Sequence, residues 1–142
     1  MKIQSEQEML NFGKQFADGL KTELSQPIVI ELVGDVGAGK TTFVRGLAQG
    51  LGLTQPVTSP SYTISKTYAL PDGRTLTHYD FYRLPDPGLM AEDLSENLSD
   101  PRQIIIIEWG ESIQNLLPPH HTIININYAD DGSREVTLWN YF

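Results

Sequence analysis

Cysteine is absent from this chain of 142 residues, and its absence excludes several kinds of chemistry at once. Without thiols the protein forms no disulfide bond, no cysteine nucleophile and no thiolate metal site. The sequence also lacks any apolar run near the roughly 20 residues of a membrane span, and its first eight residues are polar and acidic. We therefore expect no targeting segment, no membrane contact and a cytoplasmic protein.

Positive charge is scarce as well. Ten basic residues stand against 18 acidic ones, which gives a net charge of -8. A field of this sign repels phosphate backbones and anionic lipids, so we expect no tight autonomous binding to nucleic acid. Only five arginines are present, and they do not cluster into the arginine-bearing lid that a small-molecule kinase usually needs.

The first half of the chain predicts the order helix, strand, loop, helix. A capping box formed by Ser5 and Glu8, followed by apolar residues at helical spacing, predicts a helix over residues 5–24. The β-branched run at 28–33 predicts a strand buried on both faces, and the apolar spacing over 41–51 predicts a second helix.

The second half predicts mostly strands. The elements we expect are a hairpin of 61–70 with 74–81 about the turn 71–73, a short helix within 86–100, a buried strand at 104–107, and a last pair of strands at 122–127 and 135–139. A chain of this length has the size of one compact domain. We therefore predict a single α/β domain over residues 1–142, with a P-loop NTPase-like mixed sheet flanked by helices.

The run Gly34-Asp35-Val36-Gly37-Ala38-Gly39-Lys40-Thr41 fits the pattern of a phosphate-binding loop. Glycines let backbone N-H groups point at phosphate oxygens, and the following helix offers the positive end of its dipole. We expect Lys40 to reach the β- and γ-phosphates and the Thr41 hydroxyl to ligate Mg2+. The remaining expected nucleotide contacts are Asp35, Gly37, Ala38, Gly39 and Thr42. The alternative is a glycine-rich turn that merely ends in a helix.

Two carboxylates are candidates for the metal site and for catalysis. Glu108 ends a fully apolar strand, which directs it to the carboxyl edge of the sheet, where a P-loop protein needs an acidic group near Mg2+. The alternative for Glu108 is a surface carboxylate that only ends a strand. Asp80, near the end of the hairpin, is either a second metal ligand or an aspartate that bonds its own turn.

Other conspicuous residues suggest packing. Trp109 is expected to pack in the core rather than to stack on a base. Strand alternation places His78 and Asp80 on one face and Tyr79 and Phe81 on the other, so this cluster is the edge of a site or plain packing. A histidine metal site is not expected, because His120 and His121 lie far from His78 in sequence.

These motifs together resemble the TsaE family of P-loop ATPases, also called the YjeE family, over nearly the whole chain. The resemblance rests on the P-loop and Thr42, and then on Thr58-Ser59-Pro60-Ser61-Tyr62-Thr63, His78-Tyr79-Asp80-Phe81-Tyr82-Arg83 and Glu108-Trp109-Gly110-Glu111. Ser61 stands where the family usually has threonine, which keeps the hydroxyl.

The resemblance implies ATP rather than GTP, with Mg2+ held near Thr41 and Glu108 and with Asp80 close by. It also implies a switch-like loop at 58–63 and additional nucleotide contacts from Glu6 and Arg134. The family works with TsaD and TsaB in forming N6-threonylcarbamoyladenosine in tRNA, as the ATPase subunit. The implied enzyme is therefore a P-loop ATPase that is weak alone, depends on partner proteins, and meets tRNA only through the complex.

Two other functions stay open at this point. A small-molecule or nucleoside kinase shares the loop and the sheet, and a non-hydrolytic switch would use ATP binding alone to remodel the 58–63 loop. A GTPase is less expected, because the chain contains no Asn-Lys-x-Asp motif to read guanine.

Overall fold

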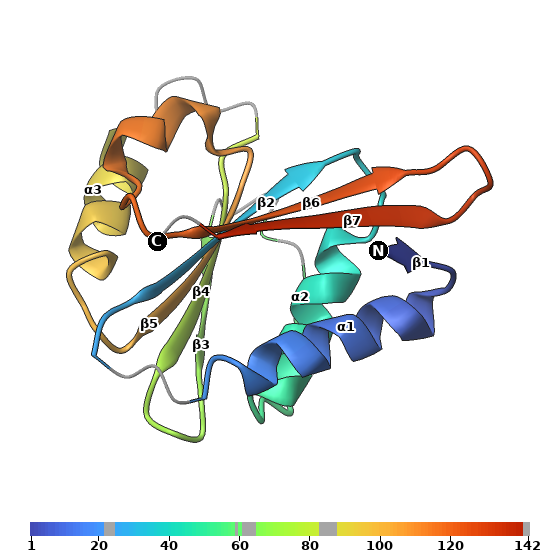
Figure 1. Cartoon of the computed structure of the whole chain (residues 1–142). Helices are drawn as coiled ribbons and strands as arrows, with labels where there is room; N and C mark the ends of the chain where they lie inside the picture. The colour runs from blue at the N-terminus through green and yellow to red at the C-terminus, as the bar shows by residue number, and fades with distance from the viewer. Residues whose placement is uncertain (22–24, 59, 61–64, 83–87, 141–142) are drawn as a thin grey trace.

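The computed structural model describes residues 1–21, 25–58, 60, 65–82 and 88–140 and is built on one seven-stranded sheet (Figure 1). Its strands are β1 (Lys2–Ile3), β2 (Ile28–Gly34), β3 (Ser65–Ala69), β4 (Thr75–Asp80), β5 (Gln103–Glu108), β6 (Thr122–Tyr128) and β7 (Arg134–Asn140). They lie in the order β1-β7-β6-β2-β5-β4-β3. The four inner strands β6, β2, β5 and β4 are parallel, whereas β3, β7 and β1 run antiparallel to the strands they join. The predicted α/β class with a mixed sheet is confirmed.

Helices cover both faces of this sheet. α1 (Glu6–Asp18) and α2 (Lys40–Gly50) lie on one face, and α3 (Gly88–Asn97) and the 3-10 helix η1 (Gly110–Leu116) lie toward the other (Figure 1). Two buried clusters fill the space between helices and sheet. Ile104 and Ile106 of β5 join the cluster beneath α1 and α2, and Ile105 and Ile107 join the one beneath α3 and η1. The run of four isoleucines therefore reflects a central strand buried on both faces.

α1 and α2 approach each other unusually closely through glycines. A Cβ added to Gly46 would lie 2.2 Å from the carbonyl oxygen of Leu10, and one added to Gly13 would lie 2.5 Å from the carbonyl oxygen of Phe43. Both obstacles are backbone atoms, which cannot turn aside as a flexible side chain can. The two glycines therefore set the distance between α1, which precedes β2, and α2, which follows the P-loop.

The structure corrects the predicted first helix. It does begin after Ser5, whose hydroxyl accepts a hydrogen bond from the Glu8 amide, but it ends at Asp18 rather than continuing to residue 24. At this end the amides of Gly19 and Leu20 bond to carbonyls three residues back, which tightens the last turn and stops the α-helical pattern. Residues 22–24 lie outside the described part of the chain.

Most of the other elements agree with prediction. The 71–73 turn closes the β3–β4 hairpin with hydrogen bonds between Leu70 and Arg74 and from Gly73 to Leu70, while residues 61–64 of its first predicted strand lie outside the description. α3 lies within the 86–100 segment in which a short helix was predicted, and residues 86–87 of that segment are not described. β1 and η1 were not predicted. β1 has only two residues, and η1 contains a non-helical residue, Ile113, so neither has a clear periodicity.

Candidate functional site

The P-loop lies between β2 and α2, as its sequence predicts. Gly34, Gly37 and Gly39 all have positive φ, at 135°, 78° and 111°. Gly34 also passes close to β6, because a Cβ there would lie 1.9 Å from the carbonyl oxygen of Ile126. Any side chain at Gly34 would therefore be both strained and blocked. α2 begins directly after this loop with no side-chain cap at Gly39, so its first amides and its positive dipole end face the loop.

Lys40, the first residue of α2, is buried, with only 7% of its surface exposed. Its Nζ donates hydrogen bonds to the carbonyl oxygens of Gly34 at 2.9 Å and Asp35 at 3.4 Å. The same ammonium lies 5.0 Å from the centre of the Trp109 ring. The lysine is thus held across the loop, with its charge at the place where a phosphate would be bound.

Asp35 has a structural role that its sequence position did not reveal. Its carboxylate accepts a hydrogen bond from the Tyr128 amide at 2.9 Å, and its own amide donates to the carbonyl of Ile126 and the side chain of Asn127. The hydroxyl of Tyr128 in turn reaches the carbonyl oxygen of Val36 at 3.4 Å. The first half of the P-loop is therefore fastened to the end of β6.

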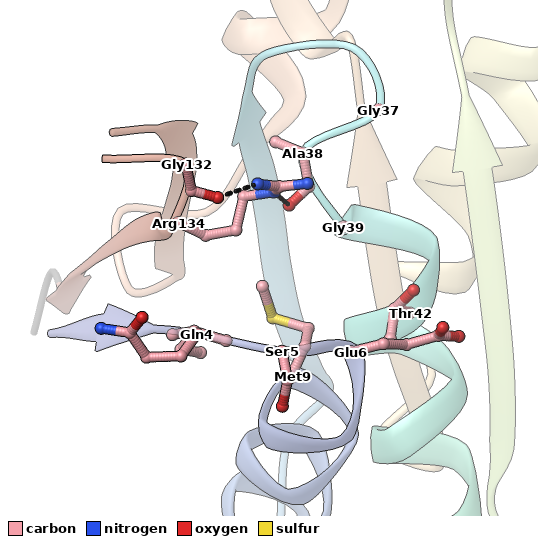
Figure 2. A pocket seen from close by; sticks show the side chains of 11 residues that line it. Gln4, Ser5, Glu6, Met9, Gly37, Ala38, Gly39, Thr42, Gly132 and Arg134 are labelled. Atoms are coloured by element: carbon pink, nitrogen blue, oxygen red, sulfur yellow. Dashed lines mark hydrogen bonds between the residues drawn. The ribbon is translucent and has the colours of Figure 1, made fainter. Parts of the chain in front are cut away.

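Glu6 and Arg134, which come from distant parts of the chain, both line one cavity with the P-loop (Figure 2). The cavity has a volume of about 410 Å³, and its other walls are formed by Ile3, Gln4, Ser5, Met9, Gly37, Ala38, Gly39, Thr42 and Gly132. The structure therefore brings Glu6, Arg134, Thr42 and three loop residues together.

The Arg134 guanidinium is fixed from several sides. Its Nε donates to the carbonyl of Ala38 at 3.1 Å and its Nη1 to that of Gly132 at 2.9 Å (Figure 2), while the group stacks on the Tyr128 ring at 4.3 Å. Glu6 is more exposed and lies 3.4 Å from the Arg45 guanidinium. Arg134 is therefore the more rigid of these two charges in the cavity.

Asp80 and Glu108 lie side by side. β4 and β5 are parallel and pair these two residues directly, so their backbones are neighbours at the carboxyl edge of the sheet. They are on the same face as Ile106, which packs under α2. Both carboxylates therefore project toward the helix whose second residue is the half-buried Thr41.

Each carboxylate has an identified partner. Glu108 is buried and its Oε2 lies 2.6 Å from Nε2 of the fully buried His78, so its interpretation as a surface carboxylate is wrong. One oxygen of Asp80 accepts a hydrogen bond from the Tyr82 amide at 2.9 Å, the self-bonding turn considered from sequence, and only 9% of Asp80 is exposed.

His78 is the residue whose role here was missed. Its alternation with Asp80 was visible in the sequence, but the pairing of its strand with the strand that ends at Glu108 was not. In the described residues, no set of three histidine, aspartate or glutamate side chains is arranged to hold a metal ion alone. Mg2+ commonly takes one or two carboxylates and completes its shell with water and phosphate oxygens. The Asp80 and Glu108 carboxylates, which lie on the sheet face that carries α2 and its Thr41 hydroxyl, therefore fit that ion.

Trp109 does not pack in the core, contrary to prediction. It is half-buried and belongs to neither core cluster. Its ring contacts the Lys40 ammonium, and the centre of the Tyr82 ring is 4.8 Å from its own. Its backbone is left-handed, with φ 56° and ψ 49°, and it is the one non-glycine residue in the described ranges with positive φ. Such a conformation costs about 1 kcal/mol or more and persists only where its surroundings enforce it.

The 58–63 loop falls largely outside the described residues. Ser59 and residues 61–64 are not described, and neither is Arg83, the last residue of the third motif, 78–83. At the edge of the loop, Lys66 Nζ contacts the Thr58 hydroxyl.

Comparison with known proteins identifies the family and agrees with the fold. The sequence profile of the family described as "Threonylcarbamoyl adenosine biosynthesis protein TsaE" matches residues 3–136. A tRNA threonylcarbamoyladenosine biosynthesis protein TsaE from Haemophilus influenzae is 41% identical over 92% of this chain and 82% of its own length. The protein of that name from Streptomyces coelicolor is 44% identical over 78% of each chain. The crystal structure of Bacillus subtilis YdiB superposes with a TM-score of 0.78 at 32% identity, covering all of this chain and 84% of the other.

Proposed function

The chain belongs to the TsaE family, and from that premise we propose that it binds and hydrolyses ATP to support N6-threonylcarbamoyladenosine biosynthesis in tRNA, together with TsaD and TsaB. Proteins of this family carry the name of that tRNA modification. The observation that carries the proposal is the convergence of Lys40, the open start of α2 and the Asp80 and Glu108 pair at one edge of the sheet. Residues 1–142 act as one P-loop ATPase domain in this proposal.

The P-loop with Lys40, and the cavity bounded by Glu6 and Arg134, suggest how the nucleotide would be oriented. The triphosphate would lie against the P-loop amides and Lys40, where positive charge and N-H donors converge. The nucleoside would occupy the cavity bounded by Glu6 and Arg134, whose groups lie beside Gly37, Ala38, Gly39 and Thr42. Two of the three N–H donors of the Lys40 ammonium bond to the Gly34 and Asp35 carbonyls, and its third donor would point to a phosphate oxygen.

Mg2+ would be held by the Thr41 hydroxyl and the Glu108 and Asp80 carboxylates. When bound, the ion would neutralise charge that develops on the transferred phosphoryl group. The His78 contact fixes the orientation of the Glu108 carboxylate, which limits the rearrangement needed when the site fills.

Catalysis would come mainly from positioning and electrostatics. Phosphoryl transfer asks for little covalent chemistry from the protein, so Lys40 and the loop amides would act by stabilising charge. Because Lys40 is bound to its own loop and Glu108 to His78, we expect slow hydrolysis by the isolated chain. Partner proteins would raise that rate by favouring the productive arrangement.

The charge of the protein supports contact with tRNA through partners. A net charge of -8 opposes direct docking on a phosphate backbone. No helix in the described ranges is long and apolar enough to cross a membrane. We propose that the protein works in the cytoplasm, away from membranes.

Mg-ATP binding and turnover, measured with and without TsaD and TsaB, test this function. The wild type should bind Mg-ATP, hydrolyse it slowly alone and turn over faster with partners. Lys40→Ala should weaken binding by about 100-fold or more, since it removes the ammonium that would pair with phosphate. Lys14→Ala, which removes an exposed lysine of α1, is the matched control and should behave as the wild type.

Other outcomes would point to other functions. A full hydrolysis rate that partners leave unchanged would refute partner dependence. Phosphate transfer to a nucleoside in preference to water would indicate a kinase. A Glu108→Gln variant that binds ATP and still supports tRNA modification would indicate a switch that needs no hydrolysis.

A further inference from the structure

Glu31 is a buried carboxylate inside an otherwise apolar central strand. It lies in β2, three residues before the P-loop begins, and only 6% of its surface is exposed. Its register partner in β5 is Ile107, which packs beneath η1, so Glu31 projects to the face opposite α1 and α2. A buried carboxylate is costly unless it is hydrogen-bonded, so its partners indicate why a charge is kept there.

The nearest partner of Glu31 is Gln114 of η1. Gln114 Nε2 donates to Glu31 Oε2 at 2.7 Å and also lies 3.1 Å from the carbonyl oxygen of Gly110. His121 Nε2 lies 3.5 Å from the other Glu31 oxygen. One amide group therefore joins the carboxylate of the P-loop strand to the first residue of η1.

Gly110 also packs directly on the carboxylate. A Cβ at Gly110 would lie 3.2 Å from Glu31 Oε2 and 3.1 Å from a methyl group of Ile107. Gly110 follows Trp109, whose left-handed backbone needs enforcement by its surroundings. The contacts of Glu31 and Gln114 therefore converge on Gly110, the residue immediately after Trp109.

A second cavity of about 410 Å³ lies on this side of the loop. Its lining includes Glu31, Lys40, Trp109 and Gly110. The ammonium of Lys40 and the indole of Trp109, 5.0 Å apart, thus line the same space as Glu31.

We propose that Glu31 is a positioning residue for the nucleotide site, acting through Gln114 and Gly110 to hold Trp109 in its left-handed turn beside Lys40. The inference rests on the proposed function, in which Lys40 binds the phosphates of ATP. Glu31 touches no reacting group in this role. It keeps the indole where it shields and orients the ammonium.

The test uses two readouts on the full chain in a Trp139→Phe background, which leaves Trp109 as the single tryptophan. Acrylamide quenching of Trp109 fluorescence, without nucleotide, reports whether the indole stays in place. Calorimetric titration with Mg-ATP reports the affinity of the site. The variants are Glu31→Met, Glu31→Gln and Gln114→Leu, with Asn115→Leu as the matched control on the same helix.

Glu31→Met and Gln114→Leu should both increase quenching and weaken Mg-ATP binding by about tenfold, the effect of losing one hydrogen bond to a charged group. Glu31→Gln should stay near the parent in both readouts, because its side-chain carbonyl still accepts from Gln114. Asn115→Leu should match the parent. Gln114 is exposed, so its variant keeps the test decisive even if Glu31→Met does not fold.

Parent-like quenching and affinity in Gln114→Leu would overturn the inference, whatever happens to the melting temperature. If the parent itself bound no Mg-ATP, the proposed function would fail instead. The quenching experiment, which needs no nucleotide, would still decide whether Glu31 positions Trp109.

Discussion

Replacing Gly46 with alanine tests the close packing of α1 on α2. The new Cβ would lie 2.2 Å from the carbonyl oxygen of Leu10 and 2.9 Å from its carbonyl carbon and Cα. Ordinary contacts are longer by about 1 Å or more, so the helices must separate. Such overpacking costs about 1–3 kcal/mol, while the better helix propensity of alanine returns at most about 1 kcal/mol.

The net expectation is a loss of about 1–2 kcal/mol. For a chain of this length the entropy of unfolding is about 0.3 kcal/mol/K, so the melting temperature should fall by about 3–7 K. The site should respond too, because α1 carries Glu6 and Met9, and a Cβ at Gly39 would lie 3.1 Å from the Met9 methyl group. Mg-ATP affinity should therefore fall together with stability.

Differential scanning calorimetry with two comparison variants makes this prediction sharp. Gly19→Ala is the control, since its Cβ would lie 3.5 Å from the nearest atom and its φ is -71°, so its melting temperature should stay the same or rise slightly. Gly13→Ala opens the same interface from the other helix, so the double variant should lose less than the two single losses combined. A Gly46→Ala protein that melts at or above the wild-type temperature would refute the packing argument.

Three further predictions concern single side chains. Arg134→Met should weaken Mg-ATP binding about tenfold in calorimetric titration. Arg134→Lys should restore little of that affinity, because a lysine lacks the planar group that stacks on Tyr128. An unchanged affinity in Arg134→Met would remove Arg134 from the site. The Ser133 hydroxyl and amide, with Lys2, hold the pKa of Asp131 far below its usual 3.8. Asp131→Asn should therefore lower the melting temperature at pH 7, and this deficit should shrink as the pH falls below about 3.8. A deficit that does not depend on pH would contradict this. Burial, and then the hydrogen bond to Asp93, raises the pKa of the Tyr79 phenol well above 10.0. Tyr79→Phe should therefore lower the free energy of unfolding in denaturant by about 1–2 kcal/mol at neutral pH. The difference should fade above about pH 10, where the tyrosine of the unfolded chain ionises first.

The sequence alone was enough for the features that depend on neighbours in the chain. The P-loop follows from glycine, lysine and threonine at fixed spacing, and the strands at 28–33 and 104–107 follow from unbroken β-branched runs. The Ser5 cap is equally local, and the structure confirms each of these. The fold class followed because such runs, alternating with amphipathic helices, have few ways to bury their faces.

Only the tertiary structure decided which distant residues meet. Asp80 lies beside Glu108 because β4 joins β5 in parallel at one register, and a register shift of one residue would have placed the two carboxylates on opposite faces of the sheet. The same pairing brings His78 to Glu108. Strand order is set by the packing of the whole sheet, which no local spacing encodes.

The same reason explains what sequence reasoning got wrong or missed. Trp109 looked like a core residue because large aromatic side chains usually are, yet its left-handed turn places it over Lys40 instead. Glu31 was not singled out from the sequence, and its role follows only from the tertiary structure, which brings Gln114, 83 positions away, within hydrogen-bonding distance. The chain's local chemistry thus determined that a phosphate loop forms, while long-range packing decided which charges and rings surround it.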